Sequence, residues 1–291
     1  MNDRQVLGVI GGSGLYDVPG LEEIERVRVD TPYGPPSDSL LRARLPGVPH
    51  ELVFLPRHGR GHRYPPHSIN YRANICALKK LGVTHVLSCS AVGSMREDIA
   101  PGDLVVVDQF IDLTKRRLST FFEPDAAAHV SFADPICPVL SGALFGAAER
   151  VAKTTVHRGG TYVCIEGPQF STRAESRVYR SWQVDVIGMT NMPECKLARE
   201  AELPYATLAL VTDYDCWHAS EEAVDVTAVL GRLSALVEQA KGVVRELARA
   251  LPDVSRSPAR GALGSAVMTQ VAAMGPETRA RLGWLLPDLA S

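Results

Sequence analysis

The fold of this chain follows from Leu208-Ala209-Leu210-Val211-Thr212-Asp213-Tyr214-Asp215-Cys216-Trp217, an apolar run that ends at two carboxylates. A short apolar run bounded by polar residues is typical of a buried strand, and in open α/β sheets ligands bind at the carboxyl ends of strands. Asp213 and Asp215 therefore lie where a ligand is expected. On an extended segment they would share a face, so that one pKa would rise while the other group stayed ionised. This stretch alone leaves equally open that they only cap a helix or bind water.

Other apolar runs also end at polar residues. Residues 6–10 lead into Gly11-Gly12-Ser13-Gly14, and Glu51–Pro56 leads into Arg57-His58-Gly59. We expect strands at residues 6–10, 27–30, 40–45, 51–56, 84–89, 104–107, 161–165, 184–188 and 208–213. Helical patterns alternate with them at residues 70–81, 143–152, 193–202 and 227–251, and a capping-type Ser or Thr at 171–172 precedes a further helix. The alternation predicts an α/β fold, with a mainly parallel or mixed central β-sheet flanked by helices.

The chain divides by composition into three parts. Residues 1–251 carry the alternating pattern, and residues 114–138 within them read as a long ordered excursion, a kind of loop that often reaches a neighbour or covers a site. Residues 252–265 form a Ser-, Pro-, Arg- and Gly-rich linker. Residues 266–291 form a tail, helical on either side of a break at Gly275-Pro276, which tucks against its own domain or docks elsewhere.

The composition excludes several classes of partner. A formal net charge of −2 gives no electrostatic reason to expect nucleic acid or an anionic membrane. The six cysteines show no C-x-x-C spacing and lie in apolar segments, as buried thiols do in a reducing compartment. No apolar run reaches about 18 residues, and no signal-peptide pattern precedes the first strand, so we expect a cytoplasmic protein.

The polar strand ends suit inorganic phosphate. Ser13, Arg57, His58, Ser90 and Thr190 offer hydroxyl, guanidinium and imidazole donors beside glycine-flanked amides. A nucleotide cofactor is not expected, because Asp17 stands where the dinucleotide fingerprint needs its third glycine, and there is no Walker lysine. We expect no metal either, since the spacing of the histidines at 58, 62 and 67 fits no zinc pattern.

The two carboxylates suit a 6-aminopurine. Adenine presents the N7 acceptor beside an exocyclic amine, and a protonated Asp213 can both donate to the first and accept from the second. Phosphate on one face of a ribose and a protonated purine on the other define phosphorolysis, in which the C1′–N9 bond breaks through an oxocarbenium-like state. We expect Asp213, Asp215 and His58 to be the catalytic groups.

Six linked motifs resemble one family. They are Gly11-Gly12-Ser13-Gly14-Leu15, Arg57-His58-Gly59, Ser90-Ala91, Glu166-Gly167-Pro168-Gln169-Phe170-Ser171, Gly188-Met189-Thr190 and Thr212-Asp213-Tyr214-Asp215-Cys216-Trp217. Together, over residues 6–251, they resemble the 5′-methylthioadenosine phosphorylase branch of the trimeric purine nucleoside phosphorylases. The resemblance implies a nucleoside phosphorylase fold, a homotrimer, a pentosyltransferase of purine and methionine salvage, and phosphate as co-substrate without further cofactor.

The resemblance also implies a role for each matched residue. Phosphate would be bound by Ser13, Arg57, His58, Ser90, Ala91 and Thr190. Met189 would pack on the ribose, and the base would be held by Phe170, Ser171, Asp213 and Asp215. The 5′ substituent would contact Val226, Val229 and Leu230, and a neighbouring subunit would complete this pocket with His129 and Leu285 of its tail.

Two positions separate the branches of the family. The 6-oxopurine enzymes have Glu where Ser171 stands and Asn where Asp213 stands, so methylthioadenosine or adenosine is the expected substrate. Against this, the segment from Asn191 to Glu194 is similar to that of a bacterial subgroup that cleaves methylthioinosine. Broader or 6-oxopurine phosphorolysis of adenosine, inosine, guanosine or methylthioinosine therefore remains open, as do hydrolysis by water and nucleoside binding without turnover.

Overall fold

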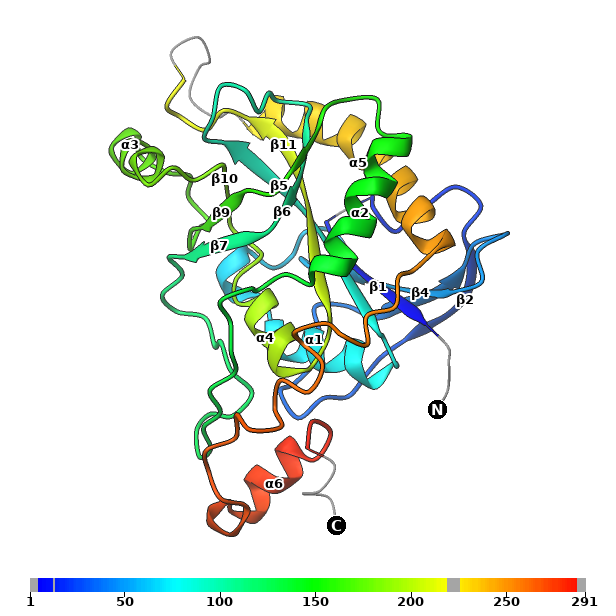
Figure 1. The fold of residues 1–291 in the computed structure, drawn as a ribbon, viewed down its shortest axis with the longest axis vertical. Coiled ribbons are helices and arrows are strands. Elements are labelled where there is room, and N and C mark those ends of the chain that lie inside the picture. The colour runs from blue at the N-terminus through cyan, green and yellow to red at the C-terminus, as the bar shows by residue number, and fades with distance from the viewer. Residues whose placement is uncertain (1–4, 13, 219–225, 287–291) are drawn as a thin grey trace.

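A computed structural model describes residues 5–12, 14–218 and 226–286, and for residues 226–230 the backbone only (Figure 1). The central strand of its sheet is β5 (His85–Ser94). One edge of β5 pairs in parallel with β11 (Tyr205–Asp213), and the other pairs with β1 (Val6–Gly11) and then, antiparallel, with β10 (Val186–Gly188). A mixed central sheet flanked by helices, as expected, is confirmed.

The remaining strands extend this sheet on both sides. They are β2 (Glu22–Val27), β3 (Leu40–Arg44), β4 (Glu51–Pro56), β6 (Leu104–Val107), β7 (Gln109–Asp112), β8 (Val156–Arg158) and β9 (Thr161–Cys164). The helices are α1 (Tyr71–Lys80), α2 (Pro138–Val151), α3 (Arg173–Ser181), α4 (Glu194–Glu200), α5 (Val226–Arg249) and α6 (Pro276–Leu282), with 3₁₀ turns at Pro66–Ser68 and Val271–Ala273.

Helices bury both faces of the apolar run in β11. Leu208 and Leu210 pack in one core with α2 and α5, whereas Ala209 and Val211 pack in the other with α1 and α4. Side chains alternate between the faces of a strand, so a strand covered on both faces is apolar throughout. This explains why residues 208–211 form an unbroken hydrophobic run.

Local signals fixed the beginnings of several helices. The Asn70 side chain accepts a hydrogen bond from the Ala73 amide at 3.2 Å, which caps α1 as the 70–81 pattern predicted. Thr172 and Glu175 form a reciprocal capping box at the start of α3. Helix α2 begins at Pro138, five residues before the expected 143, because proline suits the first helical position and the first turn already buries Leu140.

The expectation of a strand at residues 27–30 was wrong. The chain instead pairs at Glu22–Val27, antiparallel to β3. This strand lies at the sheet edge with its side chains largely exposed, so it carries no apolar pattern to mark it. The three-residue strand β8 was missed because so short a segment shows no periodicity.

The tail lies against the excursion loop of its own chain. Val267 pairs antiparallel with Ala128, and the His129 amide donates to the Ala266 carbonyl at 2.8 Å. Arg281 donates to the Phe121 carbonyl at 2.7 Å, and Trp284 packs edge-on against the ring of Phe121. Figure 1 shows the orange and red tail beside the green loop, with α6 beginning after the expected break at Gly275-Pro276.

Within the described part of the chain, no helix combines the length and the apolar character needed to cross a membrane.

Replacing Leu208 by alanine should lower the free energy of unfolding by about 2–5 kcal/mol, because it leaves a cavity in a core where this side chain is fully buried. Guanidinium denaturation measures the change. Ile24→Ala, at a side chain that is 42% exposed on the edge strand, should change it by less than about 0.5 kcal/mol. Equal losses in the two variants would contradict the two-faced burial of β11.

Candidate active site

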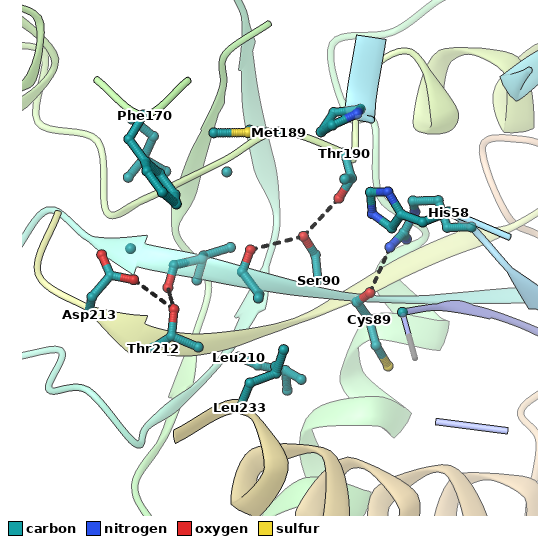
Figure 2. A pocket seen from close by; sticks show the side chains of 18 of the residues that line it. His58, Cys89, Ser90, Phe170, Met189, Thr190, Leu210, Thr212, Asp213 and Leu233 are labelled. Carbon is teal, nitrogen blue, oxygen red and sulfur yellow. Dashed lines mark hydrogen bonds between the residues drawn. The ribbon is translucent and has the colours of Figure 1, made fainter. Parts of the chain in front are cut away.

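A cavity of about 570 Å³ lies at the carboxyl ends of β1, β4, β5 and β11 (Figure 2). It gathers most of the residues that the sequence predicted. Its lining includes Arg57, His58, Ser90, Ala91, Phe170, Ser171, Met189, Thr190, Asp213 and Asp215. Strand ends far apart in the sequence therefore meet in one site.

Of the other predicted site residues, only His129 and Leu285 have described side chains, and neither lines this cavity. Ser13 lies outside the described residues, as do the side chains of Val226, Val229 and Leu230 at the start of α5. His129 is exposed on the excursion loop, and Leu285 is buried with the tail. The contribution of these two residues to a neighbour's cavity stays a prediction.

A cluster of hydroxyl groups occupies one end of the cavity (Figure 2). Ser90 Oγ lies 2.9 Å from Thr190 Oγ1 and 3.2 Å from the hydroxyl of Tyr162. A Cβ at Gly188 would lie 2.0 Å from that tyrosine hydroxyl, so the glycine lets the ring reach the cluster. Hydroxyl hydrogens rotate freely, so these groups can turn their donors toward an anion.

Arg57 is buried and its planar fork faces a carboxylate rather than the cavity. Nε and Nη2 donate to Glu194 at 2.7 and 3.0 Å, Nη1 donates to the Cys89 carbonyl at 2.9 Å, and Nη2 also donates to Ser88 Oγ. The fork pairs with this carboxylate because a buried cation needs a counter-charge, and the binding of phosphate by Arg57 stays a prediction. One N–H of Nη1 is left for a ligand.

Sequence reasoning gave Glu194 no function. It stands at the start of α4, where its side chain also accepts from the hydroxyl of Tyr205 at 2.8 Å. The sequence offered no direct signal for this pairing, apart from the rule that a buried arginine has an acidic partner.

His58 presents a neutral ring to the cavity. Burial, with the nearby Arg57 and His62 adding to it, lowers the pKa of His58 to about 4, although a hydrogen bond to the Tyr64 carbonyl opposes the shift. Nδ1 lies 2.8 Å from that carbonyl, which can only accept, so Nδ1 carries the hydrogen and Nε2 keeps its lone pair. His62, weighed from the sequence only as a metal ligand, lines the cavity and stacks on His58 at 4.1 Å.

The two carboxylates do not share one extended face, as the sequence had suggested. A register shift lies between Val211 and Asp213, and beyond Asp213 the chain turns, with Asp215 at φ 53°. The Asp215 amide donates to Asp213 Oδ1 at 2.8 Å, and Thr212 Oγ1 donates to Oδ2 at 2.7 Å. A Cβ at Gly93 would lie 2.8 Å from Asp213 Oδ1, so this glycine makes room for the carboxylate.

Burial raises the pKa of Asp215, although a contact of the Cys216 thiol with its carboxylate at 3.7 Å opposes the shift. The cause is therefore loss of water rather than repulsion between the two carboxylates, which was the expected cause.

The cavity walls near the two carboxyl groups are aromatic and polar. The Phe170 ring is 47% exposed beside the cavity, and Ser171 Oγ is buried without a hydrogen-bond partner among the described residues. A buried hydroxyl without a partner is costly, so this group is poised for a ligand atom. An aromatic ring, a hydroxyl and two carboxyl groups fit a planar, nitrogen-rich base.

Apolar side chains that the sequence did not single out form another wall. Leu15 follows the glycine-rich turn, and Leu233 and Val237 come from one face of α5. Their spacing of four residues belongs to the apolar stripe of a long amphipathic helix, a pattern that more often marks core than a binding site.

Among residues 5–12, 14–218 and 226–286, no group of three or more His, Cys, Asp or Glu side chains is placed to hold a metal ion.

Known proteins resemble this chain over nearly its whole length. The S-methyl-5′-thioadenosine phosphorylase of Geobacter sulfurreducens is 53% identical over 284 residues, which cover 97% of this chain and 98% of that protein. A crystal structure of a methylthioadenosine phosphorylase from an Antarctic soil metagenomic library matches with a TM-score of 0.90 at 49% identity, covering 98% of this chain and 99% of the other. The methylthioadenosine phosphorylase of Schistosoma mansoni in complex with adenine matches with a TM-score of 0.85 at 37% identity, covering 91% and 99%.

The family profile of the phosphorylase superfamily matches residues 6–249, which include every strand of the sheet. The resemblance carried by the six motifs is therefore confirmed by the fold and by the relatives. This chain belongs to the phosphorylase superfamily and, within it, to the family of the S-methyl-5′-thioadenosine phosphorylases.

Proposed function

We propose that this enzyme splits S-methyl-5′-thioadenosine with inorganic phosphate, giving adenine and 5-methylthioribose 1-phosphate. One observation carries the proposal: a single cavity holds a hydroxyl cluster at Ser90 and Thr190 and, beyond Met189, the carboxyl groups of Asp213 and Asp215. The relatives named above are phosphorylases of the same nucleoside, which supports it further.

The hydroxyl end suits phosphate as the nucleophile. Its donors are mostly neutral, because Glu194 already balances the charge of Arg57. Phosphate arrives as an anion and needs only placement beneath C1′, where it also stabilises the cationic sugar of the transition state. The lone pair of His58 Nε2 can accept a hydrogen bond from the O–H of hydrogen phosphate, which orients the anion.

The carboxyl end suits the departing base. As the C1′–N9 bond breaks, negative charge grows on the purine, and Asp213 assists protonation at N7. The raised pKa of Asp215 lets a proton stay at this end of the cavity at higher pH than for an exposed aspartate. Ser171 is smaller than the Glu of the 6-oxopurine enzymes, so there is room for a 6-amino group beside its unpartnered hydroxyl.

The apolar wall favours a methylthio group over a hydroxymethyl. Leu15, Leu233 and Val237 offer no polar atoms to a 5′ hydroxyl, whereas burying a methylene-sized apolar group contributes about 0.8 kcal/mol. The predicted contacts of Val226, Val229 and Leu230 would extend this wall.

We further infer that the enzyme is a homotrimer of the cytoplasm that serves purine and methionine salvage. It would need no cofactor, because phosphate is its co-substrate. The placement of His129 supports the assembly, because it is exposed and lies outside the cavity of its own chain. A neighbour would then bring it to the 5′ end of the substrate, together with the predicted contact of Leu285.

Purified enzyme should release adenine from methylthioadenosine only when phosphate is present. Release is followed for methylthioadenosine, adenosine, inosine and methylthioinosine at fixed phosphate and after exhaustive dialysis. Equal rates without phosphate would show a hydrolase, and faster cleavage of inosine or methylthioinosine would show the 6-oxopurine alternative.

Asp213→Asn should lower turnover of methylthioadenosine by about 10²–10⁴-fold, since proton transfer to the leaving base is lost. The amide should at the same time improve cleavage of inosine relative to methylthioadenosine, because it donates to a 6-oxopurine. Asp98→Asn, at an exposed surface ion pair with Arg96, serves as the control. An unchanged preference between the two nucleosides would refute the assignment of Asp213.

Light scattering should give a mass three times that of one chain. His129→Ala should raise the KM for methylthioadenosine about fivefold, as expected for one lost hydrogen bond of about 1 kcal/mol, and leave the KM for phosphate unchanged. His50→Ala provides the control. A monomer with full activity would contradict the shared cavity.

A further inference from the structure

The side chain of Arg117 is buried outside the cavity lining and yet binds the loops on both sides of the cavity. Its side chain is 1% exposed, at the start of the excursion loop. A buried guanidinium is costly unless its donors are satisfied, and here the acceptors are mainly backbone carbonyls rather than a close carboxylate.

Part of the guanidinium binds the loop that follows β10. Nη1 donates to the Met189 carbonyl at 2.7 Å and to the Met192 carbonyl, on either side of Thr190. Met189 and Thr190 line the cavity, and Thr190 belongs to its hydroxyl cluster. Nη1 also donates to the hydroxyl of Tyr71 at 3.0 Å, which ties this end to α1.

The other part binds the loop that follows β9. Nη2 donates to the Glu166 carbonyl at 2.6 Å and to the Ile165 carbonyl at 3.3 Å, while Nε lies 3.4 Å from a carboxylate oxygen of Glu166. This loop continues to Phe170 and Ser171 in the cavity wall. The backbone hydrogen bonds between β9 and β10 end with the one from the Ile165 amide to the Gly188 carbonyl. Beyond this point the Arg117 guanidinium connects the two loops that follow these strands.

We propose that Arg117 is a positioning residue that sets the spacing between the phosphate-binding and base-binding loops. The inference rests on the proposed function, which assigns the two loops to the two halves of the reaction. Each loop keeps its own ligand-binding groups without Arg117, but phosphate and C1′ no longer meet in line. Such misalignment lowers the rate of the bond-making step more than it weakens the binding of either substrate.

The planar fork explains why the residue is arginine. Five N–H groups in one plane reach acceptors on opposite sides, whereas a lysine ammonium has three donors at one point. A lysine at position 117 keeps the positive charge but cannot reach acceptors on both loops. The Arg117→Lys variant therefore tests the connection between the loops separately from the charge.

Arg117→Lys should lower kcat at least about tenfold, a loss expected from a misplacement well below 1 Å, with each KM within about threefold of wild type. Adenine binding by titration calorimetry, with one site per chain, normalises kcat to folded enzyme. Arg199→Lys is the matched control, because Arg199 is also buried and donates to the carbonyls of Ser131, Asp134 and Pro135, which lie outside the cavity. It should lose stability without this fall in kcat.

Glu166→Gln gives a second test if the lysine variant does not fold. Glu166 is partly exposed and braces the start of the excursion loop, so glutamine keeps its shape and removes its charge. This variant should lower kcat a few-fold with each KM unchanged. An unchanged kcat in Glu166→Gln, a kcat for Arg117→Lys within twofold of wild type, or an equal loss in Arg199→Lys would overturn the inference. Absence of phosphorolysis in the wild type would instead overturn the proposed function.

Discussion

The geometry of the cavity depends on the buried ion pair between Arg57 and Glu194. Breaking one partner of such a pair leaves an unpaired charge in the core, at a cost of about 3–5 kcal/mol. The pair joins the end of β4 to the start of α4, and it recruits Ser88 on β5 and Tyr205 on β11 through hydrogen bonds. One pair of charges therefore links three strands and a helix. It also leaves the cavity floor close to neutral, because Glu194 balances the positive charge of Arg57.

The carboxyl ends of the strands become a site because strand residues and the loops that follow them share the lining. Strand β11 delivers Asp213 and then turns, and β10 delivers Met189 and Thr190 directly after its last residue. These two strands are buried along almost their whole length, whereas each loop is held by only a few hydrogen bonds. Arg117 supplies several of these bonds from a third, distant segment, which makes the geometry of the cavity sensitive to the fold of the excursion loop.

Much of this arrangement could be predicted from the sequence, and the failures have physical reasons. Apolar periodicity predicted β11, α1 and α5, because burial on one or both faces forces that pattern. The recurrence of polar strand ends predicted that Ser90, Thr190 and Asp213 would meet. Parallel pairing explains this for β5 and β11, whereas Thr190 reaches the site from β10, which runs antiparallel to β5. Periodicity could not reveal the turn at Asp215, the partnership of Glu194 with Arg57, or the carbonyls that Arg117 binds, because each depends on residues brought together only by the tertiary fold. The exposed edge strand β2 was misplaced because its stability comes from backbone pairing with β3, not from side-chain burial.

The pairing of the tail with the excursion loop has a mechanical consequence. The bridge between Ala128 and Val267, together with the bonds from Arg281 to loop carbonyls, makes the two segments one body although more than a hundred residues of chain separate them. A displacement of either segment must carry the other with it. A truncation before Val267 would thus loosen the excursion loop, although the loop itself keeps its full sequence. An enlarged or altered tail would change the contacts at Phe121 and Ala128 first.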